Sequence, residues 1–372
     1  NANGNGLVGS LLVGGSGDDG VNVKTKNNGS PDQTTMSRNY GDDARSEIIS
    51  DASGNLLVAS CTQSTNFFTN AAFQNTNNSA LNPVRTQDGV FLRINSTVSN
   101  ILSSSYLGGN GDDAAFVLAI NPNNGNIFVA GGTASNNFPG DKSSAYQSAF
   151  QGGVCDGFVA ELSADGTNLI RSSYFGTSAV ENIYGIQFDR FGFPYIMGTT
   201  TGNWPVQNAA FSQTNGKQFI AKLQPNLSGF VYSTVFGTNN PSPNLSPSAF
   251  LVDRCENVYV SGWGGVVNTG YLNASTTGLT VTPDALKNTT DGSDVYFFVL
   301  EKNAVRQLYG SFFGQNGVGP QSIGGEHVDG GTSRFDRNGV IYQTLCANCG
   351  SAGISFPTFP ANVWSANNGA TG

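Results

Sequence analysis

Apolar and polar residues alternate along most of this chain in short runs, and each run ends at a turn. Between 156 and 162, for example, Phe158, Ala160 and Leu162 fall on one face of an extended strand, because successive side chains point to opposite faces. This alternation is typical of β-strands, and no stretch shows a helical period together with capping residues. The pattern therefore predicts an all-β protein built from many short strands.

One kind of turn recurs between pairs of expected strands. An Asp or Asn side chain accepts hydrogen bonds from nearby backbone N–H groups there, while a Gly shortly after it takes the left-handed conformation. We expect matching hairpin bends about every 65–70 residues, after strands that begin at Phe116, Tyr184 and Ala249. The turns lie at Asp51 to Gly54, Asn121 to Gly125, Asp189 to Gly192, Asp253 to Glu256 and Asp336 to Gly339.

Further markers keep the same order along the chain. A Phe-Pro or Trp-Pro step recurs at 138–139, 204–205 and 356–357, and an Ala-aromatic-Gln trio stands at 145–147. A glycine closes the last strand of each unit, and we expect those at 108, 176 and 237 to adopt positive φ at sharp exits. The closing glycines are Gly14, Gly108, Gly176, Gly237 and Gly314.

These repeats predict a β-propeller built from four-stranded antiparallel blades of about 65–70 residues. Each such sheet is apolar on both faces, so neighbouring blades must cover one another. A stacked β-solenoid is the main alternative, although its coils are usually shorter. About five repeats are expected, the first and last incomplete, in one segment of a larger protein. The expected division is an outer strand at Leu7–Gly14 with an insertion loop (1–44), blades at 45–108, 109–176, 177–237 and 238–314, and a partial blade at 315–372.

Composition narrows the partners. The chain has 372 residues, of which 49 are glycine and only 11% are charged, which suits short strands joined by tight turns. Its net charge of −8 argues against nucleic acid or an anionic membrane surface, because both require a basic patch. No apolar run approaches the roughly 20 residues that cross a bilayer, so membrane insertion is not expected.

Several stretches resemble a known repeat. YLGGNGDD (106–113), NIFVAGGTASNNFP (126–139) and DGFVAELSADGTNLIRSSYFG (156–176) are similar to the SBBP-type β-propeller repeat of bacterial surface proteins. DRCENVYVSGWGG (253–265) and HVDGGTSRFDRNGVIYQTLCANCG (327–350) resemble, more narrowly, the propeller region of large gliding-motility-associated surface proteins of Bacteroidetes. This resemblance implies an extracellular or cell-surface protein that is exported by the type IX secretion machinery.

The resemblance, and the lack of a marked nucleophile, base and orienting group, imply a non-enzymatic structural or adhesive module. Its expected partners are a polysaccharide or a surface protein. One alternative is a subunit that associates with itself into an extracellular filament or surface layer through unpaired strands. A second is a glycan-active hydrolase. No catalytic and no cofactor-binding residue is predicted.

Acidic loops supply the weak metal candidates. Asp18, Asp19, Asp112 and Asp113 stand in two Gly-Gly-x-Gly-Asp-Asp loops, and calcium takes several such oxygens at once. The loops lack the regular alternating Asp spacing of established calcium sites, so capping of the turn is the alternative, and calcium is the one cofactor left open. The carboxylates of Asp291, Asp294, Asp329 and Asp336 carry the same ambiguity.

The remaining candidates are cysteines, one histidine and three tryptophans. Cys346 and Cys349 are disulfide candidates in an oxidising exterior, the alternatives being free thiols or a metal or redox pair. The other cysteines are Cys61, Cys155 and Cys255. His327 is the only histidine and has no marked catalytic partner, which favours a structural role. Trp204, Trp263 and Trp364 occupy repeat-marker positions, which favours packing over stacking on sugars.

Overall fold

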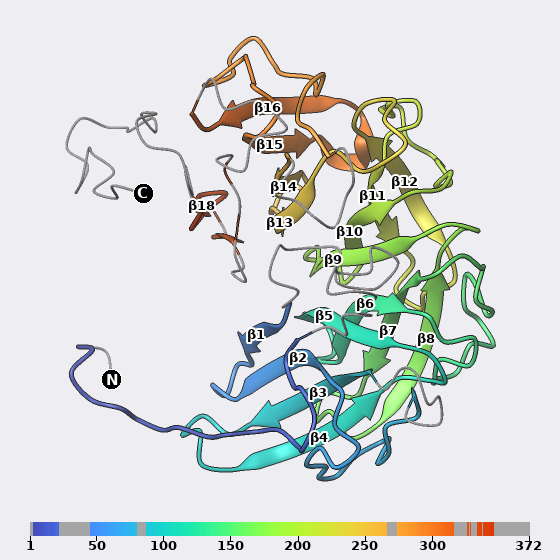
Figure 1. Ribbon diagram of the computed structural model, residues 1–372, viewed down its shortest axis with the longest axis vertical. Coiled ribbons are helices and arrows are strands. Elements are labelled where there is room, and N and C mark those ends of the chain that lie inside the picture. Colours follow the sequence, from blue (N-terminus) through green and yellow to red (C-terminus); the bar gives the residue numbers. More distant parts are fainter. Residues whose placement is uncertain are drawn as a thin grey trace, which may run out of the picture. The chain divides into compact units, whose positions relative to one another are not determined.

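The computed structural model describes residues 3–21, 45–79, 87–265, 274–315, 326, 328, 333–336 and 338–345. Their regular structure is β-strand, with short 3₁₀ turns such as Lys302–Ala304. Four four-stranded antiparallel sheets follow one another along the chain, and a two-stranded hairpin comes last (Figure 1). Over the described part of the chain, no helix has the length and apolar character that a membrane crossing requires.

Within each sheet, strands adjacent in sequence are adjacent in space. The first sheet consists of β1 (Glu47–Ser50), β2 (Leu56–Thr62), β3 (Asp88–Ile94) and β4 (Ile101–Leu107). The second consists of β5 (Asp113–Ile120), β6 (Ile127–Thr133), β7 (Asp156–Leu162) and β8 (Leu169–Phe175). The third consists of β9 (Glu181–Phe188), β10 (Pro194–Thr200), β11 (Gln218–Leu223) and β12 (Phe230–Phe236). The fourth consists of β13 (Ser246–Val252), β14 (Val258–Trp263), β15 (Val295–Leu300) and β16 (Gln307–Phe313), and β17 (Arg334–Phe335) pairs with β18 (Ile341–Tyr342).

This succession of sheets confirms the predicted fold class, an all-β propeller of four-stranded antiparallel blades. The expected hairpin bends are confirmed too. Gly54, Gly125, Gly192 and Gly339 all have φ between 77° and 84°. The Asp51 carboxylate accepts hydrogen bonds from the backbone N–H groups of Ser53 and Asn55, at 2.9 Å each. At the turn that lacks the glycine, Glu256 itself takes a φ of 68°.

The chain divides into two compact units, and the third sheet contributes strands to both. Of the described residues, the first unit contains 3–21, 45–198 and 221–231, and the second contains 199–220 and everything from 232 onward.

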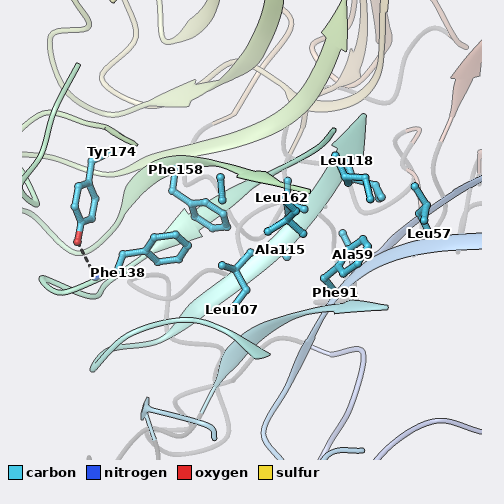
Figure 2. Close-up of a cluster of buried hydrophobic side chains, with 13 residues drawn as sticks. Leu57, Ala59, Phe91, Leu107, Ala115, Leu118, Phe138, Phe158, Leu162 and Tyr174 are labelled. Carbon is cyan, nitrogen blue, oxygen red and sulfur yellow. Dashed lines mark hydrogen bonds between the residues drawn. The ribbon is translucent and has the colours of Figure 1, made fainter. Parts of the chain in front are cut away.

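In the first unit, the first and second sheets bury their apolar faces against each other (Figure 2). Leu57, Ala59 and Phe91 of the first sheet form one cluster with residues of the second. Phe158, Ala160 and Leu162 all belong to this cluster, so the alternation along β7 places them on one face as predicted. The other face of the second sheet is covered as well, because the ring of Phe128 packs at 4.9 Å from that of Phe188 on β9.

The second unit repeats this packing around the fourth sheet. The rings of Phe236 and Phe298 stack at 4.2 Å and 4° on one face. Trp263 and Val295 form a cluster with Val328 on the other. A blade therefore depends on neighbours on both sides for its core, since a single sheet cannot cover its own faces.

Two sequence expectations are wrong. No strand forms at Leu7–Gly14; instead Leu11 and Val13 pack against the apolar cluster of the first sheet, while the side chain of Leu12 is exposed. Of the closing glycines expected to have positive φ, only Gly237 does, at 131°. At Gly108 and Gly176 the glycine is required by close approach, because a Cβ there would collide with a neighbouring carboxyl group.

Candidate functional site

A pair of polar side chains flanks the closing glycine after each four-stranded sheet. One member begins or directly precedes the third strand of that sheet, and the other precedes or begins the next β-element. We call these the junction pairs. They are Asp88 with Asp113, Asp156 with Glu181, Gln218 with Asn244, and Asp294 with Glu326.

The closing glycine of the first junction is held between two carboxyl groups. A Cβ at Gly108 would lie 2.5 Å from Asp88 Oδ1 and 2.8 Å from Asp113 Oδ2. Asp113 Oδ2 accepts hydrogen bonds from the backbone N–H of Gly109 at 2.7 Å and from Ser135 Oγ at 2.6 Å. Both aspartates are fully buried, so the junction keeps two acidic groups away from water.

A glutamine side chain also binds the closing glycine of each of the first three junctions, and at the second it belongs to the Ala-aromatic-Gln trio. Gln147 Oε1 accepts from the N–H of Gly176 at 2.8 Å, and its Nε2 donates to the carbonyl of that glycine at 3.0 Å. Gln74 and Gln213 accept in the same way from Gly108 at 3.1 Å and Gly237 at 2.7 Å. The trio that marks the repeats is therefore part of the junction.

At the second junction, Asp156 and Glu181 are again fully buried. Glu181 accepts from the backbone N–H and the hydroxyl of Thr177, at 2.7 Å each. Asp156 Oδ2 accepts from the backbone N–H of Gln151 at 2.6 Å, whereas Oδ1 has no hydrogen-bond partner in the described part of the chain.

Burial raises the pKa of the aspartates in the first two junctions, because it disfavours the charged form. It raises the pKa of Asp88 to about 7 and that of Asp113 well above its ordinary value, with the charge of Asp88 adding to the second shift. Burial likewise raises the pKa of Asp156 to about 7, and the charge of Glu181 acts in the same direction. At neutral pH a proton is therefore readily held in these junctions.

The third junction carries amides where the others carry acids. Gln218 Nε2 donates to the carbonyl of Phe236 at 3.0 Å, and Gln218 Oε1 accepts from the backbone N–H of Asn244 at 2.7 Å. Asn244 Oδ1 accepts from the N–H of Thr238 at 2.9 Å, as the glutamate of the second junction does from Thr177. The same architecture is thus made without an ionisable group.

The fourth junction adds a cation. Lys287 stands where the other repeats have the trio glutamine, and its Nζ forms an ion pair with Asp294 and donates to the carbonyl of Gly314 at 3.1 Å. Glu326 Oε1 accepts from the N–H of Gln315 at 2.7 Å, and its Oε2 has no hydrogen-bond partner in the described part of the chain. Burial raises the pKa of Glu326 to about 7; it also raises that of Asp294, against the opposing effect of Lys287.

The calcium candidates lie in two separate loops. Asp19 accepts from the N–H of Gly15 at 2.7 Å, as Asp113 does in its own loop, which is the capping role described as the alternative. Asp18 is exposed and Asp112 is buried. The described residues contain no group of three or more His, Cys, Asp or Glu side chains arranged to hold a metal ion.

The other candidates have structural surroundings or fall outside the described part of the chain. Cys61 and Cys155 are buried and Cys255 is exposed, and none of the three forms a disulfide in the described part of the chain. Trp204 stacks on Phe219 at 3.7 Å, and Trp263 is fully buried. Asp336 Oδ1 caps its turn by accepting from two backbone N–H groups, and Asp291 Oδ1 accepts from the N–H of Ser293. His327, Asp329, Cys346, Cys349 and Trp364 lie outside the described residues.

Sequence reasoning missed the junction pairs. The sequence predicts roles for Asp113, Asp294 and the closing glycines, but none for Asp88, Asp156, Glu181 or Glu326. The available signal was the recurrence of Asp-Gly at the start of β3 and β7, paired with an acid a few residues after the next closing glycine.

Comparison with solved structures returns propeller proteins. An exo-β-1,3-galactanase from Phanerochaete chrysosporium matches at 12% identity with a TM-score of 0.37, over 81% of this chain and 54% of its own. A thermostable family-43 glycoside hydrolase matches at 9% identity and 0.36, over 85% and 89%. The β-propeller domain of the Trilobed protease from Pyrococcus furiosus, described as having an open velcro topology, matches at 7% and 0.35, over 84% and 80%. This chain thus spans about half the length of the galactanase. No protein-family model and no curated protein matches the sequence.

These matches correct the functional expectation. The sequence led us to expect a non-enzymatic structural or adhesive module, whereas the similar structures include glycoside hydrolases, which are enzymes. Identities of 12% or less concern the fold alone and assign no activity to this chain.

Proposed function

We propose that this chain is a glycan-active hydrolase whose acid and base are the two carboxyl groups of the fourth junction. The observation that supports the proposal is the unequal environment of Asp294 and Glu326. Asp294 contacts the Lys287 ammonium, whereas the pKa of Glu326 is raised to about 7 by burial. Two neighbouring carboxyls with different environments are the arrangement that acid–base cleavage of a glycosidic bond requires.

The roles follow from the charges. Burial raises the pKa of Asp294, but the Lys287 ammonium opposes this effect and favours the carboxylate, so Asp294 is assigned as the base or nucleophile. Glu326 keeps a proton up to neutral pH and gives it to the leaving glycosidic oxygen. Lys287 is a positioning residue, because its contacts are with Asp294 and with backbone carbonyls.

The fourth junction differs from the others in the features that matter here. The described ion pairs include none with Asp88, Asp113 or Asp156, and the third junction has amides in place of acids. Lys287 therefore gives the two carboxyl groups of the fourth junction unequal surroundings.

An extracellular polysaccharide is the proposed substrate class, and the type IX secretion machinery is the proposed route of export. The support for both is the sequence resemblance to propeller regions of bacterial surface proteins.

The test is release of reducing sugar from a panel of plant, algal and bacterial polysaccharides by the purified wild-type chain. We expect Glu326→Gln and Asp294→Asn to lower the rate at least 100-fold, the usual scale for an acid or base in catalysis. Asp284→Asn removes the same charge from an exposed position near Lys287 and should keep full activity. Absence of release from every polysaccharide, or activity in Glu326→Gln, would end the proposal.

Access to substrate gives a second test. Both carboxyl groups are fully covered in the structure, so catalysis requires that they become reachable. Carbodiimide labelling at pH 6, read by mass spectrometry of peptides, measures this directly. We expect the reagent to modify Glu326, and we expect the polysaccharide that serves as substrate to protect Glu326 from modification. An unreactive Glu326 in the native protein would contradict a catalytic role.

A further inference from the structure

We propose that Asp156 binds a proton at neutral pH, and that this proton does at the second junction what the Gln218 side-chain amide does at the third. The inference does not depend on the proposed hydrolase. It concerns the joint between blades in the first unit, and it makes that joint sensitive to pH.

The two residues occupy equivalent places. Asp156 is the first residue of β7, and Gln218 is the first residue of β11. Asp156 Oδ1 is the atom nearest to where a Cβ on Gly176 would stand, and Gln218 Nε2 is nearest at Gly237, at 2.5 Å. The carboxyl oxygen without a partner therefore takes the place of the amide nitrogen.

The amide nitrogen is a donor, and this decides the protonation state. Gln218 Nε2 donates to the carbonyl of Phe236, the last residue of β12. The corresponding last residue of β8 is Phe175. An ionised carboxylate only accepts, so it cannot reproduce the bond of Gln218, whereas a protonated carboxyl has an O–H that donates.

The surroundings of Asp156 also favour the neutral form. The charge of Glu181 on β9 acts on it, and Cys155 beside it and Tyr174 of β8, on which the charge of Asp113 also acts, are neutral at pH 7. The described ion pairs include none with Asp156. A fully buried charge without a cation beside it is costly, so a proton is the compensation that remains.

The raised pKa of Asp156, about 7, agrees with this geometry and sets the direction of the effect. The ordinary pKa is 3.8, so the folded state binds the proton more tightly than the unfolded chain. The stabilising contribution is complete below the ordinary pKa and is lost as the pH rises through about 7.

The test is the melting temperature of Asp156→Asn against wild type from pH 5 to pH 9. Asn has the size of a protonated Asp and a permanent donor. We expect equal melting temperatures near pH 5, and an advantage of a few degrees for the variant at pH 8 to 9. Asp165→Asn changes an exposed Asp in the turn between β7 and β8, and should show the same pH profile as wild type. A variant that melts below wild type by a constant amount at every pH overturns the proposal.

The reciprocal variant covers the case in which Asp156→Asn does not fold. Gln218→Glu puts an ionisable group into the junction that has amides. We expect it to match wild type at pH 5 and to lose stability relative to wild type as the pH rises through neutral. A Gln218→Glu protein with the pH profile of wild type would show that these positions do not need a donor, and the proposal would fail.

Discussion

The atoms beside each closing glycine decide whether a larger residue can replace it. Gly108 and Gly176 do not need positive φ, so a larger residue could adopt their backbone conformation. What excludes a side chain is the carboxyl group beside each one. Because that carboxyl group is buried and hydrogen-bonded, it cannot move away from an added methyl group, and the close contact strains the structure.

Gly108→Ala should therefore destabilise the protein by about 1–3 kcal/mol, the usual cost of overpacking. The new Cβ would lie 2.5 Å from Asp88 Oδ1 and 2.8 Å from Asp113 Oδ2. Gly229→Ala is the control, because a Cβ at Gly229 has no atom within 4 Å. The measurement is urea unfolding of both variants and wild type. Equal unfolding free energies for Gly108→Ala and Gly229→Ala would contradict the steric explanation.

Between neighbouring strands, tyrosines tie the long connections to the sheet. In the second sheet, the Tyr174 hydroxyl accepts from the backbone N–H of Phe138 at 2.9 Å (Figure 2). The same hydroxyl donates to the carbonyl of Ser135 at 2.9 Å. Tyr106 makes the same two bonds to Phe67 and Ser64 in the first sheet. The connection from the second to the third strand, which contains the Phe-Pro step, is thereby held by the fourth strand.

Tyr174→Phe should cost about 1–3 kcal/mol of unfolding free energy, because it leaves a buried N–H and a buried carbonyl without their partner. Tyr342→Phe is the matched control, since Tyr342 is 63% exposed and should tolerate the change. Thermal unfolding of both variants measures the difference. Hydrogen exchange of the Phe138 amide gives a local check: faster exchange in Tyr174→Phe is expected, and unchanged protection would contradict this role of the hydroxyl.

Comparison of the observed strands with the expected ones shows which elements the sequence predicts. Alternation of apolar residues and the turn chemistry of Asp51 or Asp189 predict the hairpins, because both are local. The expected strand starts at Phe116, Tyr184 and Ala249 are each three residues late, since the strands begin at Asp113, Glu181 and Ser246. Those first residues are polar, so the apolar pattern does not include them. They belong to the strand because of contacts with residues outside it.

The junction pairs could not be predicted from local sequence patterns either, because they too depend on contacts between distant parts of the chain. Asp88 and Asp113 belong to different repeats, and what joins them is the packing of one sheet on the next. The amides of Gln218 and Asn244 also hide the pattern, because a search for repeated acids stops at the third repeat. Leu7–Gly14 shows the opposite error: its sequence favours a strand, yet no neighbouring strand in the described chain pairs with it.

At the scale of the whole molecule, the acidic groups buried between blades should govern the pH dependence of stability. The pKa values of Asp88, Asp156 and Glu326 are each raised to about 7 by burial, so each favours folding below its ordinary pKa and loses that contribution as the pH rises through about 7. Hydrogen bonds at more exposed positions lower the pKa of Asp141 and of Asp165 from 3.8, so their contribution to folding is lost only as the pH falls below that value. A net charge of −8 adds self-repulsion at alkaline pH.

The melting temperature of the wild-type chain should therefore fall as the pH is raised from about 5 to about 8. The raised groups govern this pH range, because Asp141 and Asp165 are ionised in both the folded and the unfolded chain above pH 5. Differential scanning fluorimetry in buffers of constant ionic strength measures this, and repetition at high salt separates the two causes: repulsion between surface charges is screened, whereas protonation inside the junctions is not. A melting temperature that rises toward pH 8 would contradict protonation of the buried carboxyls and would mean that they are paired with cations.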